Sequence, residues 1–334
     1  MRASVLFLVC VASCAPRNEA PAPLVVPVAE SAWTVERSEP GGVLLSVWGS
    51  SPTDLWAVGG QAERGLVLHG DGTQWTPVET GALGLLWWVY GFGANDVYAA
   101  GERGLLLHYD GVTWKHVATG TTKTLFGLWG ASGEDVWVVG GEATGAPGSA
   151  VILRGSRGSF TRVEDVPHAL LPNALFKVYG HSADRLVAVG RDGTVLRYDG
   201  TPGTWRREDV PTSVPLISLW GRGANDLYAV GGHSEAVMLH FDGVQWREVP
   251  DLGAGPELFG VFTAPGQPVI AVGAGTQVLE LMPGKAAVAH ETPDIGVPFL
   301  LHSVWGDASG AVYAVGGSLL DYPAPMRGVI LRRR

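Results

Sequence analysis

The chain has 334 residues, of which 46% are hydrophobic and 16% charged, and its formal net charge is −9. This length is enough to bury a sizeable core, and the acidic balance, with no cluster of basic residues, argues against a nucleic-acid-binding face. Its 48 glycines and 22 prolines are spread along the chain. Because both residues break helices, the composition excludes a helix bundle and favours short strands joined by tight turns.

The N-terminal residues have the pattern of an export signal. Arg2 is followed by an apolar run over 5–12 and then by Ser13 and Cys14. Such a run is too short to span a bilayer. The sequence therefore predicts a signal peptide over 1–13. Because the only two cysteines, Cys10 and Cys14, lie in this region, we expect no disulfides in the folded domain.

The segment Val-Ala-Ser-Cys at 11–14 resembles a bacterial lipobox. The resemblance implies that Cys14 is lipidated and becomes the mature N-terminus. Ala15 replaces the aspartate that favours inner-membrane retention, which implies the outer membrane or the cell surface. An ordinary signal peptide with an incidental cysteine is the alternative. Residues 14–30, with four prolines, are predicted to form an extended, lipid-anchored linker ahead of a domain over 31–334.

One unit recurs seven times along the chain. Its first copy is Val-Trp-Gly at 47–49 followed by Asp-Leu-Trp-Ala-Val-Gly at 54–59. Successive copies begin 42, 39, 50, 41, 42 and 43 residues apart. The other copies are 89–91 with 96–101, 128–130 with 135–140, 178–180 with 184–190, 219–221 with 226–231, 261–262 with 269–273, and 304–306 with 311–316.

Each unit divides into four short runs rich in β-branched and aromatic residues, and Gly, Asp or Pro bounds each run. In the first unit the third and fourth runs are 65–69 and 74–78. Four strands in a repeat of this length are typical of a propeller blade. The sequence therefore predicts an all-β fold, a seven-bladed β-propeller with four-stranded blades.

The two ends of the repeat array predict how the ring closes. The seventh unit has only three strands, the last over 328–332. Ahead of the first unit, the segment 32–36 contains Trp33 and matches the fourth strands that contain Trp75, Trp114, Trp205 and Trp246. We expect this segment to become the outer strand of the last blade, which would leave no open sheet edges.

Asp-Gly turns precede three of the fourth strands, at Asp71, Asp110 and Asp242. We expect the carboxylate to accept backbone N–H groups while the glycine takes a positive φ. These turns resemble the Asp-box (BNR) repeats of sialidase-related and other bacterial propellers, here combined with WD-like repeats. Three blades depart from the turn pattern, at Arg157-Gly158, Asp199-Gly200 and Pro283-Gly284.

An aromatic residue occupies one first-strand position in all seven units. We interpret this set as core side chains that wedge between blades, with a ligand cage as the alternative. The set is Trp48, Tyr90, Trp129, Tyr179, Trp220, Phe262 and Trp305. The histidines at a repeated third-strand position, His69, His108 and His240, are likewise interpreted as blade packing.

Two positions before that aromatic, five units have a small residue, but blades 2 and 4 have Trp88 and Lys177. We expect these two side chains near the mouth of the central channel, where they would stack on a ligand and pair with its charge. The alternative is that they merely fill a wide channel.

The loops between second and third strands supply the remaining candidate binding residues. They include Arg191 in blade 4, His233 and Glu235 in blade 5, and Asp321 and Tyr322 in the long loop of blade 7. Elongated loops on a rigid scaffold concentrate function. A rim of mixed charge containing an aromatic residue favours a protein or glycan partner.

Catalytic and metal-binding motifs are absent from the sequence. It has no His-Glu-x-x-His or Cys-x-x-Cys spacing, no Gly-x-Ser-x-Gly and no phosphate loop, so no catalytic residue, metal or cofactor is predicted. The sequence favours a non-enzymatic, envelope-anchored propeller that binds or scaffolds a protein or glycan. The alternative is a carbohydrate-active hydrolase resembling sialidases, with Arg64, Arg103 and Arg191 holding a carboxylate beside Asp321 and Tyr322. The oligomeric state is left open.

Overall fold

The computed structural model describes residues 33–252, 255–282, 288–290, 292, 299–307, 309–319 and 325–333. The predicted signal peptide, Cys14 and the linker lie outside the described residues, as do Asp321 and Tyr322.

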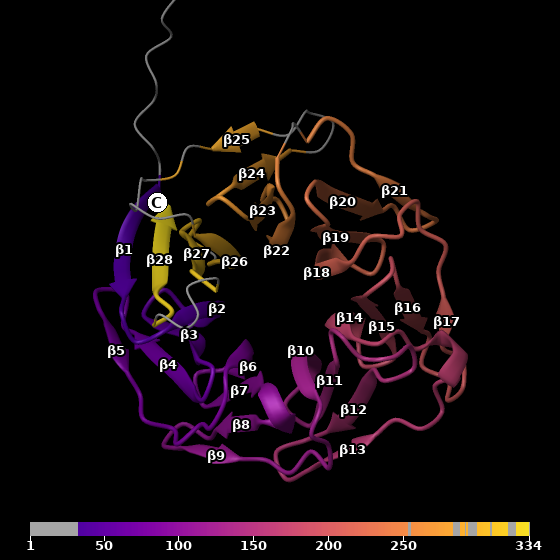
Figure 1. Ribbon diagram of the computed structural model, residues 1–334, viewed down its shortest axis with the longest axis horizontal. Coiled ribbons are helices and arrows are strands. Elements are labelled where there is room, and N and C mark those ends of the chain that lie inside the picture. The colour runs from indigo at the N-terminus through magenta and orange to yellow at the C-terminus, as the bar shows by residue number, and fades with distance from the viewer. Residues whose placement is uncertain are drawn as a thin grey trace, which may run out of the picture. The chain divides into compact units, whose positions relative to one another are not determined.

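Seven four-stranded antiparallel sheets surround a common centre (Figure 1), which confirms the predicted seven-bladed propeller. The first, innermost strands are β2 (Val43–Ser51), β6 (Leu86–Gly93), β10 (Thr124–Ser132), β14 (Leu175–Ser182), β18 (Leu216–Gly223), β22 (Leu258–Phe262) and β26 (Leu300–Gly306). The second strands are β3 (Asp54–Gln61), β7 (Asp96–Gly101), β11 (Asp135–Gly141), β15 (Arg185–Gly190), β19 (Asp226–Gly232), β23 (Val269–Gly273) and β27 (Val312–Gly317).

The third and outer strands complete each blade. The third strands are β4 (Arg64–Gly70), β8 (Leu106–Tyr109), β12 (Val151–Gly155), β16 (Val195–Tyr198), β20 (Ala236–Phe241), β24 (Val278–Leu281) and β28 (Gly328–Arg333). The outer strands are β5 (Trp75–Pro77), β9 (Trp114–His116), β13 (Phe160–Arg162), β17 (Arg206–Arg207), β21 (Trp246–Glu248), β25 (Val288–His290) and β1 (Trp33–Glu39). The described helical structure consists of two short 3-10 turns, η1 (Glu102–Gly104) and η2 (His168–Leu170). No described helix is long and apolar enough to cross a bilayer.

The N-terminal strand β1 closes the ring, as predicted. It pairs antiparallel with β28, so the last blade has the order β1-β28-β27-β26. Figure 1 shows the indigo strand β1 beside the yellow strand β28. Trp33 is 1% exposed and packs in the core of this blade with Val329 and Leu331. Residues from both ends of the chain therefore build one sheet.

The repeated spacing of aromatic and glycine residues in the first strands is explained by contacts between blades. A Cβ on Gly91 would lie 2.6 Å from Trp48 of the preceding blade, and one on Gly180 would lie 2.4 Å from Trp129. The ring of one blade thus fills the space that the next blade's glycine leaves empty. This confirms the wedging for Trp48 and Trp129, whereas Tyr90 and Trp220, from the non-neighbouring blades 2 and 5, face each other with ring centres 6.1 Å apart.

The Asp-Gly turns have the predicted geometry. Asp71 Oδ1 accepts the backbone N–H groups of Thr73 and Gln74, both at 2.8 Å, and Gly72 has a φ of +85°. Asp110 and Asp242 make the equivalent pair of contacts in blades 2 and 5. The Thr73 hydroxyl, together with these N–H groups, holds the pKa of Asp71 well below the usual range for aspartate. The Lys115 ammonium, together with the turn N–H groups, does the same for the pKa of Asp110.

Candidate functional site

The antiparallel strands give the ring two different faces. The loops between second and third strands share one face with the segments that enter each first strand, and we name this the loop face. The turns between first and second strands and between third and fourth strands lie on the opposite side, which we name the turn face. The predicted binding loops all belong to the loop face.

Backbone hydrogen bonds between neighbouring blades fix the loop face. The same contact recurs at six successive junctions. A backbone N–H near the loop between the second and third strands of one blade donates to a carbonyl in the segment that enters the first strand of the next blade. The pairs are Gly65–Ala82, Gly104–Lys123, Gly148–Leu171, Gly193–Val214, Ala236–Gly255 and Thr276–Phe299, at 2.8–3.1 Å. Between the last and first blades, Gln61 bonds the backbone of Met326 in both directions, at 2.8 and 3.0 Å.

Three of the loop residues predicted to bind a partner are described, and they lie on the loop face in the neighbouring blades 4 and 5. His233 and Glu235 of blade 5 are exposed and flank Ser234, whose φ is +75°. Arg191 of blade 4 is half-buried, and its guanidinium donates to the Ala143 carbonyl of blade 3 at 2.7 Å. Arg191 therefore also supports the long loop of blade 3, residues 142–150 between β11 and β12.

Trp88 and Lys177 are brought together inside the channel. Lys177 Nζ lies 4.1 Å from the centre of the Trp88 ring, although the two residues belong to blades 2 and 4. Gly127 of blade 3 makes this possible, because a Cβ there would lie 3.0 Å from the Cα of Lys177. Lys177 is 4% exposed. A ligand would therefore have to enter the channel to reach its ammonium group.

The hydrogen bonds of Lys177 are made to backbone carbonyls. Its Nζ donates to Phe126 O at 3.0 Å and to Phe176 O at 3.3 Å. Burial disfavours the charged form and lowers the pKa of Lys177 to about 7. The Trp88 indole donates to Leu128 O at 3.0 Å, which fixes the ring beneath the ammonium.

A collar of mostly apolar side chains, which was not predicted from the sequence, lies beside this pair. Every first strand has a β-bulge here, where the pairing register shifts by one residue. The extra residues, which we name the collar, are Leu45, Trp87, Phe126, Phe176, Ile217, Phe259 and His302. The repeat alignment could have identified these residues, because each immediately precedes the repeat position that Trp88 and Lys177 occupy in blades 2 and 4.

The collar side chains contact one another around the channel. Trp87 lies 5.2 Å from Phe126 and 5.8 Å from His302, measured between ring centres, and Phe259 stacks on His302 at 5.7 Å. His302 Nδ1 donates to Leu45 O at 2.8 Å. Burial, reinforced by the nearby Lys177 charge, lowers the pKa of His302 to about 4. The imidazole is therefore neutral at pH 7.

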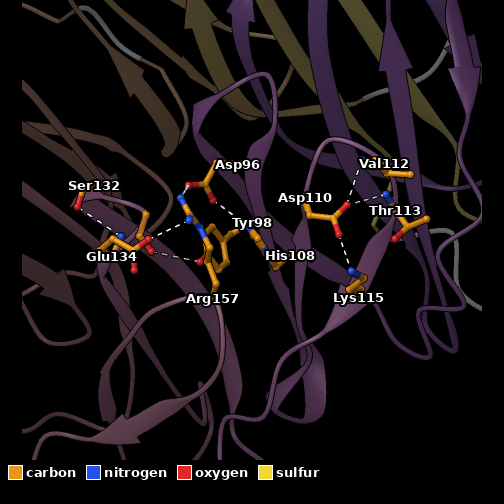
Figure 2. Close-up of polar contacts among 11 residues, drawn as sticks. Asp96, Tyr98, His108, Asp110, Val112, Thr113, Lys115, Ser132, Glu134 and Arg157 are labelled. Atoms are coloured by element: carbon orange, nitrogen blue, oxygen red, sulfur yellow. Dashed lines mark hydrogen bonds and ion pairs between the residues drawn. The ribbon is translucent and has the colours of Figure 1, made fainter.

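On the turn face, a recurring polar unit joins the second and third strands. In blade 2, His108 Nε2 lies 2.8 Å from Asp96 Oδ1, and the imidazole packs on Tyr98 with ring centres 4.5 Å apart. Figure 2 shows this unit, together with Arg157 of blade 3, which reaches Asp96 at 2.7 Å. The predicted packing role of the histidines is confirmed, and the aspartate contacts are an addition to it.

The same unit recurs in other blades with small changes. Asp54, His69 and Trp56 form it in blade 1, and Asp226, His240 and Tyr228 form it in blade 5. In blade 3, Arg154 replaces the histidine: its guanidinium binds Asp135 at 2.6 and 2.8 Å and lies 4.6 Å from the centre of the Trp137 ring.

Blade 4 lacks this unit and requires a correction to the repeat. We expected Asp184 to take the place of Asp54. The strand register instead pairs Ser182 with Arg185, as Ser51 pairs with Asp54, so Arg185 holds that position. The turn has the same length as in blade 1, so Asp184 takes the turn position that Thr53 holds there.

A cleft of about 470 Å³ opens on the turn face between blades 4 and 5. Its walls come from β14, β15, β16, β17, β19 and β20 and from turn-face segments beside these strands. The lining includes Arg185, Val187, Arg197, Arg206, Glu208 and Phe241. Sequence analysis did not identify this cleft.

The three arginines considered for a sialidase-like site each have a different partner. Arg64 pairs with Glu79 at 3.3 Å, Arg103 with Glu63 at 2.7 Å, and Arg191 with the Ala143 carbonyl. No group of three or more described His, Cys, Asp or Glu side chains is arranged to hold a metal ion.

No protein-family model matches the sequence, and no curated protein sequence matches it. Solved structures with the same fold include YCF48 bound to a D1 peptide (16% identity, TM-score 0.64), covering 91% of this chain and 97% of that chain. The WD40 β-propeller domain of Doa1 (11%, TM-score 0.68) covers 90% and 97%. YCF48 from Cyanidioschyzon merolae (15%, TM-score 0.65) covers 91% and 99%. The chain has a WD40-like propeller fold.

Proposed function

We propose that the chain is a non-enzymatic propeller that binds a protein partner through its loop face. The observation that carries this proposal is the set of backbone hydrogen bonds that fixes each loop to the next blade. Loops already held in one conformation lose little entropy on binding. The solved complex of YCF48 with its D1 peptide supports the choice of a protein partner over a glycan.

The chemistry of the loop face is compatible with a protein surface. Exposed His233 and Glu235 in blade 5 and the Arg103–Glu63 pair between blades 1 and 2 present both signs of charge. Complementary charges of this kind select a partner and orient it. Ser234 takes a left-handed φ, and strain of this kind clusters at functional loops.

We assign Trp88 and Lys177 a supporting role in this surface, because they contact each other beneath the collar. Arg191 supports it in the same way by bonding the long loop of blade 3. Asp321 and Tyr322, outside the described residues, remain predicted members of the partner-binding surface.

Crosslinking in the native envelope tests the proposal. The double variant His233→Ala/Glu235→Ala removes two exposed side chains, and Val112→Ala, 81% exposed on the turn face, is the matched control. We expect wild type and control to recover the same protein and the loop variant to lose it. Equal recovery by all three, recovery of a glycan alone, or turnover of glycosides by the wild type would contradict the proposal.

The predicted anchor forms the second part of the proposal: Cys14 carries a lipid that holds the mature chain at the bacterial envelope. Cys14→Ser should abolish incorporation of labelled fatty acid and move the protein from the membrane fraction to the soluble fraction. Labelling that persists in this variant would show that Cys14 is not the lipidated residue.

A further inference from the structure

Blade 4 replaces all three members of the polar unit found on the turn face of blades 1, 2 and 5. The aspartate position holds Arg185, the aromatic position Val187 and the histidine position Arg197. Elsewhere a tryptophan or tyrosine ring fills this place against its histidine, with ring centres 4.4–4.5 Å apart. A valine leaves the volume of that ring empty, and the cleft of about 470 Å³ lies there.

The same replacement reverses the sign of the charge. An aspartate becomes Arg185, which is exposed and makes no hydrogen bond or ion pair with any described residue. The five ionised side chains that line the cleft, Arg185, Arg197, Arg206, Asp199 and Glu208, give a local charge of 3 − 2 = +1. In a chain of net charge −9, the lining of this cleft therefore has a local excess of positive charge.

One of the three arginines is already neutralised. Arg197 makes a two-pronged contact with Glu208, at 2.5 and 2.9 Å, and lies 4.4 Å from the centre of the Phe241 ring of blade 5. Glu208 also accepts the Trp246 indole N–H at 2.8 Å. This half-buried group forms a fixed floor for the cleft.

The other two arginines retain free donors. Arg206 is exposed, and its guanidinium stands 3.8 Å from Asp199 and 3.7 Å from Glu208, beyond hydrogen-bonding range. Asp199 accepts hydrogen bonds from Thr201 and Thr204 of its own turn, which lower its pKa. Arg185 and Arg206 therefore offer planar N–H donors of the kind that bind carboxylates in pairs.

We propose that this cleft, on the face opposite to the loop face, binds the carboxylate of an acidic peptide segment. Arg185 and Arg206 hold the carboxylate, while Asp199, whose Oδ1 is the oxygen engaged by its own turn, accepts a backbone N–H group of the same segment through Oδ2. The two acidic side chains disfavour a polyanion such as polyphosphate. Tyr179 and Phe241 supply apolar wall, and the volume is in the range of small-ligand sites, roughly 300–1,000 Å³.

Binding of defined peptides to the full-length mature protein tests the proposal. The probes are a glutamate-rich hexapeptide with an amidated C-terminus, a Gly/Ser hexapeptide with a free C-terminal carboxylate, the same Gly/Ser peptide amidated, and polyphosphate. Fluorescence anisotropy at low and high salt gives the affinities. We expect the first or second peptide to bind, and which one binds identifies the source of the carboxylate. Binding should weaken with salt, and the amidated neutral peptide should not bind.

Matched variants assign the binding to the cleft. Arg185→Ala/Arg206→Ala should weaken binding about tenfold or more, since roughly 1.4 kcal/mol corresponds to tenfold. Arg247→Ala is the control: Arg247 follows Trp246 as Arg206 follows Trp205, and it lies outside the cleft lining. This control should change the affinity less than about twofold.

A third variant tests the volume of the cleft without changing charge. Val187→Tyr restores the ring of blades 2 and 5 and should block the peptide. Melting temperatures of all variants verify folding, and the exposed arginine variants should melt as the wild type does. Equal peptide affinity in wild type and the double arginine variant, or tighter binding of polyphosphate than of either peptide, would overturn the proposal. The loop-face proposal is unaffected by either result.

Discussion

Lys177 is buried against Trp88, with two backbone carbonyls as hydrogen-bond acceptors. A buried ammonium without a carboxylate beside it costs free energy, which appears here as a pKa lowered from 10.5 to about 7. Between these two pH values the unfolded chain holds a proton that the folded chain has lost. Unfolding then takes up a proton, so raising the pH across this interval increases the free energy of unfolding.

Lys177→Met should therefore stabilise the protein near pH 7, by about 1–3 kcal/mol, because an apolar side chain of similar length replaces a buried charge. The variant should also lose the rise in stability between about pH 7 and pH 9.5. Denaturant unfolding at several pH values measures both effects. The interval stops below pH 10 because burial raises the pKa of Tyr90 and Tyr179 to about 12, which reverses the slope.

Lys115→Met is the control, because the same substitution is made at a lysine that is 63% exposed. This control should keep the pH dependence of the wild type. A pH slope that is the same in wild type and Lys177→Met would show that Lys177 titrates normally.

Among the elements, β1 has the clearest separate role, since it is the described strand that pairs into the sheet built from the other end of the chain. Trp33 is 1% exposed, whereas Val35 on the same strand is 42% exposed. Two further contacts hold β1 in place. Arg37 of β1 donates to Trp75 O of the first blade at 2.9 Å, and Glu36 of β1 pairs with Arg332 of the last blade at 3.4 Å.

Trp33→Ala should destabilise the ring strongly, because truncating a buried tryptophan costs about 3–5 kcal/mol, or a fall in melting temperature on the order of 10 °C. Val35→Ala should have little effect. Deleting residues 1–39 should lower the melting temperature much more than deleting 1–30. If the two truncations melt together, β1 does not close the ring.

The sequence was sufficient to predict the blades, because a strict repeat places the same residue types at the same strand positions. It was sufficient for β1 as well, because Trp33 repeats the outer-strand pattern. The repeat pattern predicted the wrong start for β15, because Asp184 matches the aspartate that begins the second strand in other blades and Arg185 does not. Only the pairing of Ser182 with Arg185 reveals the shift.

At the scale of the whole molecule, the closed ring separates two surfaces. The loop face has loops fixed by backbone hydrogen bonds between blades, and the turn face has the cleft between blades 4 and 5. The sequence indicated the first surface, because loop lengths and charges are visible in the repeat. The cleft could not be predicted from the sequence, because it forms where blade 4 lacks an aromatic side chain and where blade 5 supplies the opposite wall. The contact of Lys177 with Trp88 across Gly127 likewise depends on the curvature of the ring.

Amide hydrogen exchange on the mature protein, alone and with the crosslinking partner bound, tests the central claim most directly. Exchange reports local opening of backbone hydrogen bonds. We expect the partner to slow exchange in the loop-face segments 191–194 and 233–236 and to leave the turn-face segments 71–74 and 110–113 unchanged. Protection confined to the turn face, or no protection on either face, would contradict binding through the loop face.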